Sequence, residues 1–244
     1  MKLLICSDPH GYTERLVAPF NKDEEKLTEG DVLFILGDSG LCFFTTDDPM
    51  YENERIRVQI LEKKPYTVAF IDGNHEHFGR LLEYPTEIWM GAPVHRIAKN
   101  IVHLMRGQVY NVGGKSIFTF GGAATRDKYR RRQGVSWFTE ELPCADDYKS
   151  ERESLKQAFG RVDYIFTHTG PMRALTELCH RGELPDVTEA HLALAEDAEL
   201  MGHFDWLMDE LKFEKWFFGH WHLDCLACGG RVGCIYNRPV LIEI

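Results

Sequence analysis

Residues 66–78 read Tyr-Thr-Val-Ala-Phe-Ile-Asp-Gly-Asn-His-Glu-His-Phe and change abruptly from apolar to polar. Residues 67–71 are β-branched or apolar with no polar alternation, which is typical of a strand buried on both faces. Asp72-Gly73 ends this run, and Asn74-His75-Glu76 follows directly. Because open α/β sheets bind ligands at the carboxyl ends of their strands, we expect these polar side chains to lie at a functional site.

Four other apolar runs of the chain also end in side chains that bind metals or transfer protons. These runs are Lys2–Cys6, Val32–Leu36, Val162–Phe166 and Glu214–Phe218. The side chains that follow the five runs are Asp8, His10, Asp38, Asn74, His75, His168, His220 and His222. If the five strands lie in one sheet with a shared direction, all eight side chains converge on one edge of it.

The eight side chains supply carboxylate, imidazole and amide groups, with no thiolate among them. This mixture suits Mn, Fe or Zn ions better than Ca or Mg, which prefer shells made of oxygen alone. Seven ligands are too many for one tetrahedral zinc ion, but they fit two ions that share a carboxylate. Two-metal sites are a standard device for hydrolysing phosphate esters, because charge develops on both the attacking and the leaving oxygen.

Five blocks of the chain resemble, in order, the signature blocks of the calcineurin-like metallophosphoesterases. They are Asp8-x-His10, Gly37-Asp38, Gly73-Asn74-His75-Glu76, His168 and Gly219-His220-x-His222. The resemblance implies an α/β fold, a two-sheet αββα sandwich of the metallo-dependent phosphatase type. It also implies two divalent transition-metal ions, one held by Asp8, His10, Asp38 and His222 and the other by Asp38, Asn74, His168 and His220. In such a site Asp38 bridges the ions, a metal-bridging hydroxide attacks phosphorus, and His75 stabilises or protonates the leaving oxygen.

The second block departs from the protein-phosphatase branch of this family, which has Gly-Asp-x-x-Asp-Arg. Leu41 stands where that branch has the Asp that orients the catalytic His, and Cys42 stands where it has an Arg that grips phosphate. The basic run at residues 126–132 offers replacements for this Arg, namely Arg126, Arg130, Arg131 and Arg132.

A basic run of this kind is more often a solvent-facing surface, and we expect that alternative here. A substrate without an arginine clamp would carry less charge, so we expect a phosphodiester or nucleotide-type substrate rather than a phosphomonoester. Two alternatives stay open: a phosphoprotein or phosphomonoester phosphatase, and a scaffold on the same fold that binds metal without catalysis.

Composition restricts the class of protein further. Of the 244 residues, 44% are hydrophobic and 27% charged, as in ordinary globular proteins, and the net charge of −10 argues against an extended nucleic-acid surface. The first apolar run is too short for a signal peptide, and no run approaches the ~20 apolar residues of a membrane helix. We therefore expect a cytoplasmic protein with a small phosphorylated substrate and no membrane partner. The sequence leaves the oligomeric state open.

The chain has no internal repeat and no linker, so we expect one domain over residues 1–244. Its first third alternates strand and helix around a buried sheet. Residues 101–120 are predicted to form an antiparallel meander in a second sheet, because three strand-like runs are joined by Arg-Gly and Gly-Gly turns. Residues 188–212 are predicted to be helical, in two pieces that meet near Gly202.

Overall fold

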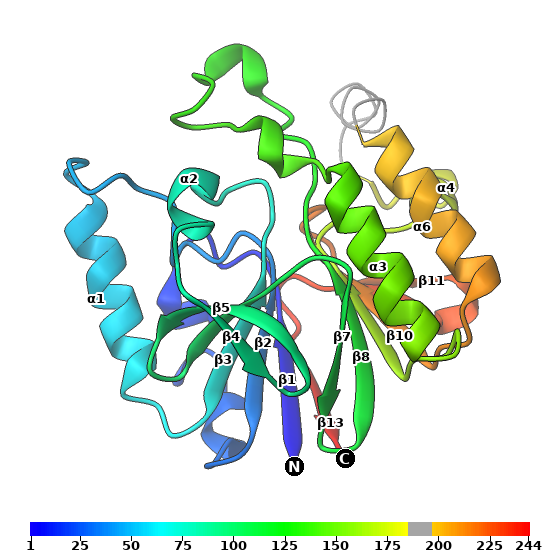
Figure 1. Cartoon of the computed structure of the whole chain (residues 1–244), viewed down its shortest axis with the longest axis horizontal. Coiled ribbons are helices and arrows are strands. Elements are labelled where there is room, and N and C mark those ends of the chain that lie inside the picture. Colours follow the sequence, from blue (N-terminus) through cyan, green and yellow to red (C-terminus); the bar gives the residue numbers. More distant parts are fainter. Residues whose placement is uncertain (185–196) are drawn as a thin grey trace.

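The computed structural model describes residues 1–184 and 197–244, whose strands form two mixed sheets with helices on the outer faces (Figure 1). Within these residues, the first sheet has seven strands, in the order β13 (Val240–Glu243), β1 (Lys2–Cys6), β2 (Val32–Leu36), β3 (Thr67–Ile71), β6 (Ile101–Leu104), β5 (Ala92–Ala98) and β4 (Thr86–Trp89). Counted over the same residues, the second has six, in the order β11 (Cys225–Ala227), β12 (Val232–Cys234), β10 (Lys215–Phe218), β9 (Tyr164–Thr167), β8 (Lys115–Phe120) and β7 (Gln108–Val112). The described helices are α1 (Tyr51–Glu62), α2 (Phe78–Leu81), α3 (Ala145–Gln157), α4 (Met172–His180) and α6 (Ala198–Glu210). The predicted αββα sandwich is confirmed.

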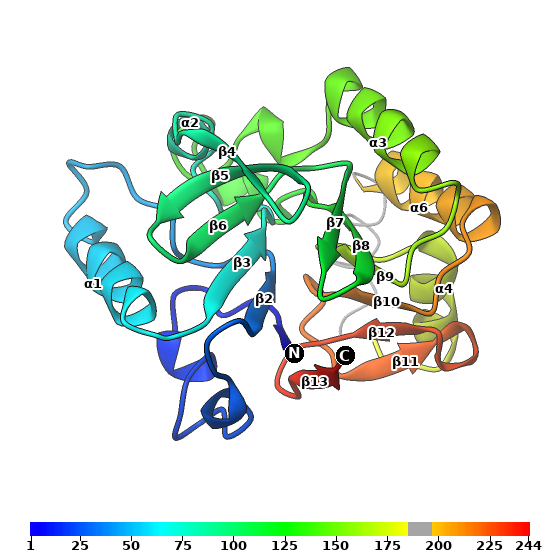
Figure 2. The ribbon, with the colours of Figure 1, turned by 60° about the horizontal axis from the view of Figure 1, so that its bottom comes forward.

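The five strands that precede the predicted site residues are divided between the two sheets. Strands β1, β2 and β3 are parallel neighbours in the first sheet, whereas β9 and β10 are parallel neighbours in the second. Figure 2 shows the two sheets side by side. The condition that all five strands share one sheet is therefore wrong, and the site forms where strand ends of two packed sheets meet.

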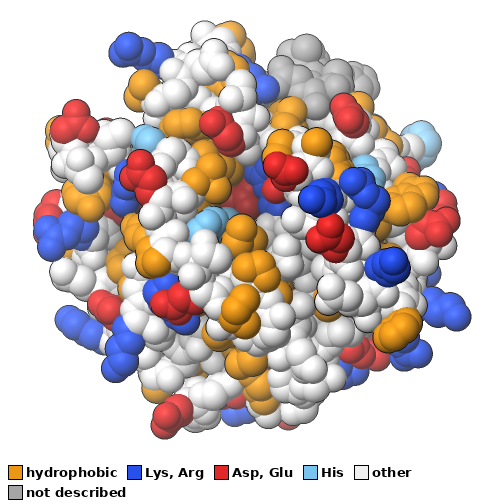
Figure 3. Space-filling view, viewed as in Figure 1, with side chains coloured by type: hydrophobic (Ala, Val, Ile, Leu, Met, Phe, Trp, Pro, Cys, Tyr) orange, Lys and Arg blue, Asp and Glu red, His pale blue; other side chains and the backbone are white. Residues whose placement is uncertain are grey.

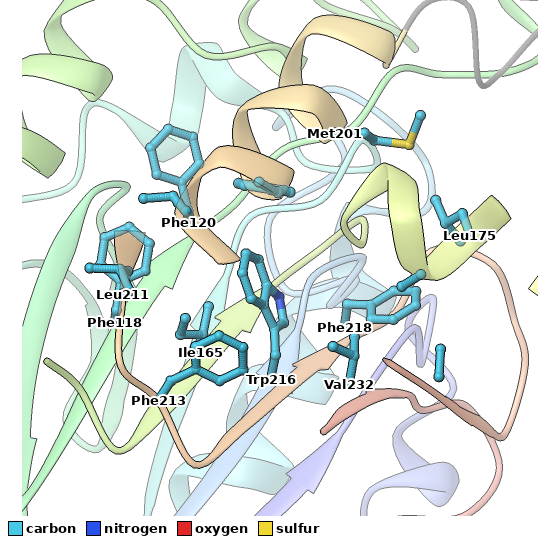
Figure 4. Close-up of a cluster of buried hydrophobic side chains, with 14 of the residues drawn as sticks. Phe118, Phe120, Ile165, Leu175, Met201, Leu211, Phe213, Trp216, Phe218 and Val232 are labelled. Carbon is cyan, nitrogen blue, oxygen red and sulfur yellow. The ribbon is translucent and has the colours of Figure 1, made fainter. Parts of the chain in front are cut away.

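Apolar side chains fill the space between the sheets and cover both outer faces. Between the sheets, the rings of Phe34 and Phe166 pack edge to face with centroids 5.0 Å apart. Helices α3, α4 and α6 cover the second sheet, where Trp216 lies fully buried in an apolar cluster (Figure 4). The Trp216 ring packs against Phe204 of α6. On the opposite face, Leu61 of α1 belongs to the apolar cluster that covers the first sheet. Each sheet is thus buried on both sides, which agrees with the apolar character of its central strands.

Two sequence-based predictions differ from the structure. Residues 101–120 do not form one meander, because β6 pairs with β3 in the first sheet while β7 and β8 pair in the second. All four residues of β6 are buried, so this strand fits an interior position better than a hairpin with one solvated face. Of the helix predicted over residues 188–212, residues 188–196 lie outside the described part, and α6 continues through Gly202 without the expected break.

A buried ion pair links the end of β3 to the loop between β6 and β7, and its arginine also binds the segment before α3. The Asp72 carboxylate accepts hydrogen bonds from Arg106 Nε at 2.9 Å and from Arg106 Nη2 at 2.5 Å. The same Nη2 donates to the carbonyl oxygens of Glu140 and Glu141. Burial by itself would raise the pKa of Asp72, but the Arg106 charge holds this pKa well below its usual range. The pair therefore fixes Asp72, two residues before Asn74, against the other half of the molecule.

The sequence predicts that an extended nucleic-acid surface and a membrane-spanning helix are both absent. On the face shown in Figure 3, Lys and Arg side chains are interspersed with Asp and Glu rather than gathered into one patch. None of the helices in the described ranges has the length and apolar character that crossing a bilayer requires. The expected lack of an extended nucleic-acid surface stays a prediction.

Candidate metal centre

The loops that leave β1, β2, β3, β9 and β10 meet at one end of the two sheets. A cavity of about 330 Å³ opens there, and its lining includes His10, Asp38, Asn74, His75, His220 and His222. Asp8 and His168 are fully buried next to it. The structure thus brings together all eight side chains that the sequence analysis singled out.

One group of close donor atoms consists of Asp8, His10 and His222, whose ligand atoms lie within 4.8 Å of one another. His10 Nε2 is 3.0 Å from His222 Nε2, and His222 Nε2 is 3.5 Å from Asp8 Oδ1. Asp38 Oδ2 lies 3.6 Å from His10 Nε2. These are the four residues that the resemblance assigns to one ion.

The opposite oxygen of Asp38 faces a second group. Asp38 Oδ1 is 3.4 Å from His168 Nε2, which in turn is 3.2 Å from Asn74 Oδ1. The His220 ring packs against the His168 ring with centroids 5.0 Å apart. Because Asp38 presents a different oxygen to each group, it lies where a carboxylate shared by two ions has to lie.

Five of the predicted ligands have a left-handed backbone. Their φ angles lie between 47° and 64°, and the residues are Asp8, His10, Asp38, His220 and His222. For a residue with a Cβ this conformation costs roughly 1–2 kcal/mol, because Cβ approaches the following carbonyl oxygen. Such strain persists where the surrounding structure imposes it, and it clusters at functional sites. The backbone thus points to the same residues as the side-chain distances.

Two glycines of the sequence motifs allow the backbone to approach the carboxylates closely. A Cβ at Gly73 would overlap Asp38 Oδ1, and a Cβ at Gly219 would overlap Ser7 Oγ and Asp8 Oδ2. Any side chain at either position would displace a predicted ligand.

Hydrogen bonds orient the buried members of the site. Asp8 accepts from the His220 backbone N–H at 3.0 Å, and Asp38 Oδ1 accepts from the His75 backbone N–H at 2.8 Å. His168 Nδ1 lies 2.7 Å from the Leu36 carbonyl oxygen. Because a carbonyl oxygen only accepts, Nδ1 carries a proton, and Nε2 is the ring nitrogen that faces Asp38.

Glu76, the last residue of the Gly-Asn-His-Glu motif, ties the second and third blocks together. Its carboxylate accepts from the backbone N–H of Ser39 at 2.9 Å and from that of Gly73 at 2.6 Å. The side chain is fully buried, and burial together with the nearby Asp38 charge raises the pKa of Glu76 to about 8. Its motif position signalled Glu76, but the sequence analysis assigned it no role.

Burial and neighbouring charges set the protonation of the site. Burial is the largest cause that lowers the pKa of His10 and of His75, and it holds the pKa of His220 well below its usual value. These imidazoles are therefore neutral near neutral pH, which is the form that binds metals. Burial opposes ionisation of Asp38, but neighbouring imidazoles, led by His168, lower its pKa to about 2.

The basic run lies in the segment between β8 and α3, which projects above the sheets in Figure 1. Arg126, Arg130 and Arg131 line the cavity, whereas Arg132 is exposed and does not line it. The solvent-facing position expected for the whole run is therefore wrong for Arg126 and Arg131, whereas Arg130 lines the cavity but is exposed, as Arg132 is. The two ends of the segment are held together, because the Thr125 backbone N–H donates to the Glu141 side chain, while Arg106 donates to the Glu140 carbonyl oxygen.

Arg126 and Arg131 contact two of the site histidines. Arg126 Nη2 donates to the His220 carbonyl oxygen at 3.0 Å, and its guanidinium lies 4.2 Å from the centre of the Trp221 ring. Arg131 Nη1 is 3.4 Å from His75 Nδ1. A guanidinium only donates, so His75 Nδ1 accepts and the proton of the neutral ring is on Nε2. Arg131 thus contacts His75 where the protein-phosphatase branch would use an Asp.

Sequence reasoning missed Asp197, which lies at the start of α6 with no exposed surface. Its Oδ1 accepts from the Ala124 backbone N–H at 2.5 Å, and its Oδ2 lies 3.7 Å from His220 Nε2. Burial raises the pKa of Asp197 to about 7. Asp197 follows none of the predicted strands and belongs to none of the five blocks, so the sequence analysis did not single it out.

The family model for calcineurin-like phosphoesterases matches residues 1–224, a range that contains every predicted ligand. The chain belongs to this family. Calcineurin-like phosphoesterases are phosphoester hydrolases that use a dinuclear divalent metal centre, and this chain has the candidate ligand groups for one.

No match was found among curated proteins. Among solved structures, the crystal structure of phosphopantetheinyl hydrolase (PptH) from Mycobacterium tuberculosis is similar over 96% of this chain and 89% of that one. The sequence identity is 16% and the TM-score is 0.45.

Proposed function

We propose that this calcineurin-like phosphoesterase hydrolyses phosphate esters in the cavity next to Asp38, with two divalent transition-metal ions bound by the seven predicted ligands. The two oxygens of Asp38 carry the proposal, because Oδ2 faces His10 and Oδ1 faces His168. The nitrogen and oxygen donors fit Mn, Fe or Zn ions. When bound, such a pair supplies a hydroxide nucleophile near neutral pH and stabilises charge on the attacking and leaving oxygens.

His75 is the residue that we propose acts on the leaving group. Its Nδ1 faces Arg131, which leaves the Nε2 proton available to the cavity that His75 lines. Its backbone N–H is bound to Asp38 Oδ1, so the residue is held beside the candidate metal bridge. A hydrogen bond from Nε2 to the leaving oxygen would stabilise the charge that develops there as the ester bond breaks.

The arginines favour a phosphomonoester as the substrate. A monoester dianion has one charged oxygen more than a diester, and Arg126 and Arg131 supply guanidinium groups at the cavity. The preference for a diester or nucleotide-type substrate rested on a solvent-facing run, which these two residues contradict. A diester remains the second candidate, because Arg131 Nε already binds Asp127 Oδ1 at 2.5 Å and so has less charge to offer.

The proposed function is tested by metal analysis followed by assays on a panel of phosphate esters. Protein reconstituted with Mn²⁺ should contain about two ions per chain and hydrolyse esters. Asp38→Asn should lower the occupancy of both ions together, whereas Asp209→Asn, at an exposed carboxylate paired with Arg173, should change neither occupancy nor activity. Only trace metal after reconstitution would refute the proposal. Two bound ions without hydrolysis of any ester would favour the non-catalytic scaffold.

A further inference from the structure

A second cavity, of about 150 Å³, adjoins the cavity at the candidate metal centre. His10 and His75 line both cavities. The rest of the lining of the second cavity consists of Gly40, Phe43, Phe44 and Arg57. Because His75 is the proposed leaving-group residue, the part of a substrate that leaves with the ester oxygen has this second cavity within reach.

A buried carboxylate fixes the backbone of the two aromatic residues. Glu54 Oε2 accepts from the backbone N–H of Phe43 at 2.6 Å and from that of Phe44 at 2.9 Å. Glu54 Oε1 is paired with Arg80 Nη1 at 2.8 Å. The two phenylalanine rings pack edge to face with centroids 5.1 Å apart, and the Phe43 ring centre is 5.9 Å from that of His75. The fold therefore holds an aromatic wall next to His75.

Arg57 of α1 brings a positive charge to this cavity. A Cβ at Gly11 would overlap the Arg57 guanidinium, so this group lies against the loop that carries His10. Arg57 Nη1 is 3.5 Å from the Gly40 carbonyl oxygen, which is a long contact. Within the described part of the chain, no carboxylate pairs with Arg57. A guanidinium without a carboxylate partner at a cavity is available to bind an anionic group.

The size and chemistry of the second cavity fit one aromatic ring that carries a negative charge. A cavity of about 150 Å³ has room for a benzene ring. Aromatic rings pack favourably edge to face or offset against other rings, and Phe43 and Phe44 offer such surfaces. An anionic substituent on the ring would supply the partner that Arg57 lacks. The volume favours a single ring over a nucleoside, which has a sugar as well as a base.

The alternative role for Arg57 is to bind the substrate phosphate, as the arginine that is missing at Cys42 does in the protein-phosphatase branch. The lining of the two cavities argues against this role. Asp38 and Asn74 line the first cavity, where the proposed function places the ions and the phosphate, and Arg57 does not line it. Arg131 already brings a guanidinium to that first cavity. Arg57 is therefore placed for the leaving group.

We propose that the substrate is a phosphomonoester of an aromatic alcohol whose ring carries an anionic group, and that Phe43, Phe44 and Arg57 bind this leaving group. The bond between phosphorus and the ring oxygen breaks while an oxygen from water bonds to phosphorus, so ester and water become inorganic phosphate and a phenol. The inference rests on the proposed function, because it takes His75 to act on the leaving oxygen. It adds the chemical class of the alcohol.

Binding of non-hydrolysable phosphonates to Mn²⁺-loaded protein tests the inference without turnover. In calorimetric titrations, 4-carboxybenzylphosphonate should bind about tenfold more tightly than benzylphosphonate. Arg57→Gln should abolish this difference, whereas Arg57→Lys keeps the charge without the paired donors and should retain part of it. The matched control is Arg55→Gln, at an exposed arginine of the same helix that binds Glu52 at 2.8 Å. This control should leave both affinities at wild-type values.

The aromatic wall is tested with the same two phosphonates. Phe44→Leu should weaken both of them by a similar factor of about 2–10, because both contain the ring that packs against Phe44. Circular dichroism checks the folding of each variant. Wild-type affinity of both phosphonates in Phe44→Leu, or an unchanged difference between them in Arg57→Gln, would overturn the proposal.

Steady-state assays separate the two roles of Arg57. On 4-carboxyphenyl phosphate, Arg57→Gln should lower kcat/KM about tenfold, and on the neutral 4-carbamoylphenyl phosphate by less than about threefold. Each decrease compares one ester on two proteins, so the reactivity of the leaving group cancels. Equal decreases on both esters would assign Arg57 to the phosphate and overturn the proposal.

The two kinds of measurement also distinguish this inference from the proposed function. If Arg57 sets the difference between the phosphonates but no ester is hydrolysed, the binding site stands and the proposed function fails. If both esters are hydrolysed and Arg57→Gln changes neither binding nor kcat/KM, the proposed function stands and the inference fails.

Discussion

Replacement of Arg131 by Gln tests whether the basic run binds the phosphate of the substrate. Arg131 lines the cavity, and its Nη1 is 3.4 Å from His75 Nδ1. Gln keeps a polar side chain but removes the positive charge. A monoester dianion has a charged oxygen for this guanidinium, whereas a diester has one charge fewer.

The expected magnitude follows from the contacts of Arg131. A hydrogen bond to a charged group contributes about 1.5–3 kcal/mol. Arg131 Nε already binds Asp127 at 2.5 Å, so part of its charge is neutralised and the lower end applies. A loss of about 1.5 kcal/mol corresponds to a roughly tenfold decrease in kcat/KM for a monoester. For a diester we expect a decrease of less than about threefold, because the third charged oxygen is missing.

The assay compares 4-nitrophenyl phosphate with bis(4-nitrophenyl) phosphate at the same Mn²⁺ concentration, so that both substrates release the same leaving group. Arg132→Gln is the matched control, because it makes the same charge change in the same run at an exposed residue that does not line the cavity. Equal decreases in kcat/KM on both esters, or an equal decrease in Arg132→Gln, would refute the binding of the substrate phosphate by Arg131. The diester would then become the favoured substrate class.

Three further predictions concern His75 and the buried cluster that consists of His95, His103, Asp72 and Arg106. His75→Ala should keep both ions but lower turnover roughly 10²–10⁴-fold, with a smaller loss in steady-state assays on nitrophenyl esters than on alkyl esters; equal losses would contradict a role at the leaving oxygen. Arg106→Met should lower the free energy of unfolding in urea by about 3–5 kcal/mol, because the buried Asp72 loses its guanidinium partner and keeps only the His103 ring. Adding Asp72→Asn should recover part of this loss, and no recovery would argue against the ion pair as its cause. Burial and the neighbouring His103, whose Nδ1 is 3.0 Å from that of His95, lower the pKa of His95 to about 4. In the unfolded chain the pKa of His95 is about 6.5, so below this pH the unfolded chain binds a proton that the folded chain does not. The free energy of unfolding therefore decreases as pH falls from about 6.5 to about 4, by on the order of 3 kcal/mol. In urea titrations at several pH values, His95→Phe should reduce this loss of stability at low pH. An unchanged pH dependence of the free energy of unfolding would exclude His95 as its source.

The sequence by itself determined which groups the site carries and where each stands on its strand. The change from apolar to polar at Ile71–Asn74 is local, and an apolar run that must be buried on both faces becomes an interior strand. A residue that directly follows such a run therefore lies at the end of the strand. This is why the sequence predicted strands β1, β2, β3, β9 and β10 and the residues that follow them.

Only the tertiary structure decided which strands share a sheet. His168 and Asp38 come from different sheets, yet their ligand atoms are 3.4 Å apart. The apolar runs before them are alike, so local pattern does not distinguish a strand of the first sheet from one of the second. Strand pairing depends on contacts between residues far apart in the chain, as the position of β6 beside β3 also shows.

For the same reason, the sequence predicts where the seven ligands lie but not where Arg131 and Asp197 lie. The ligands follow strands, whose direction carries them to the site. Arg131 reaches His75 only because its segment folds back over the strand ends, and Asp197 faces His220 only because α6 packs on the second sheet. The sequence specifies the chemical groups and the local backbone that carries them, whereas long-range packing decides which of these groups meet, because that choice depends on residues far apart along the chain.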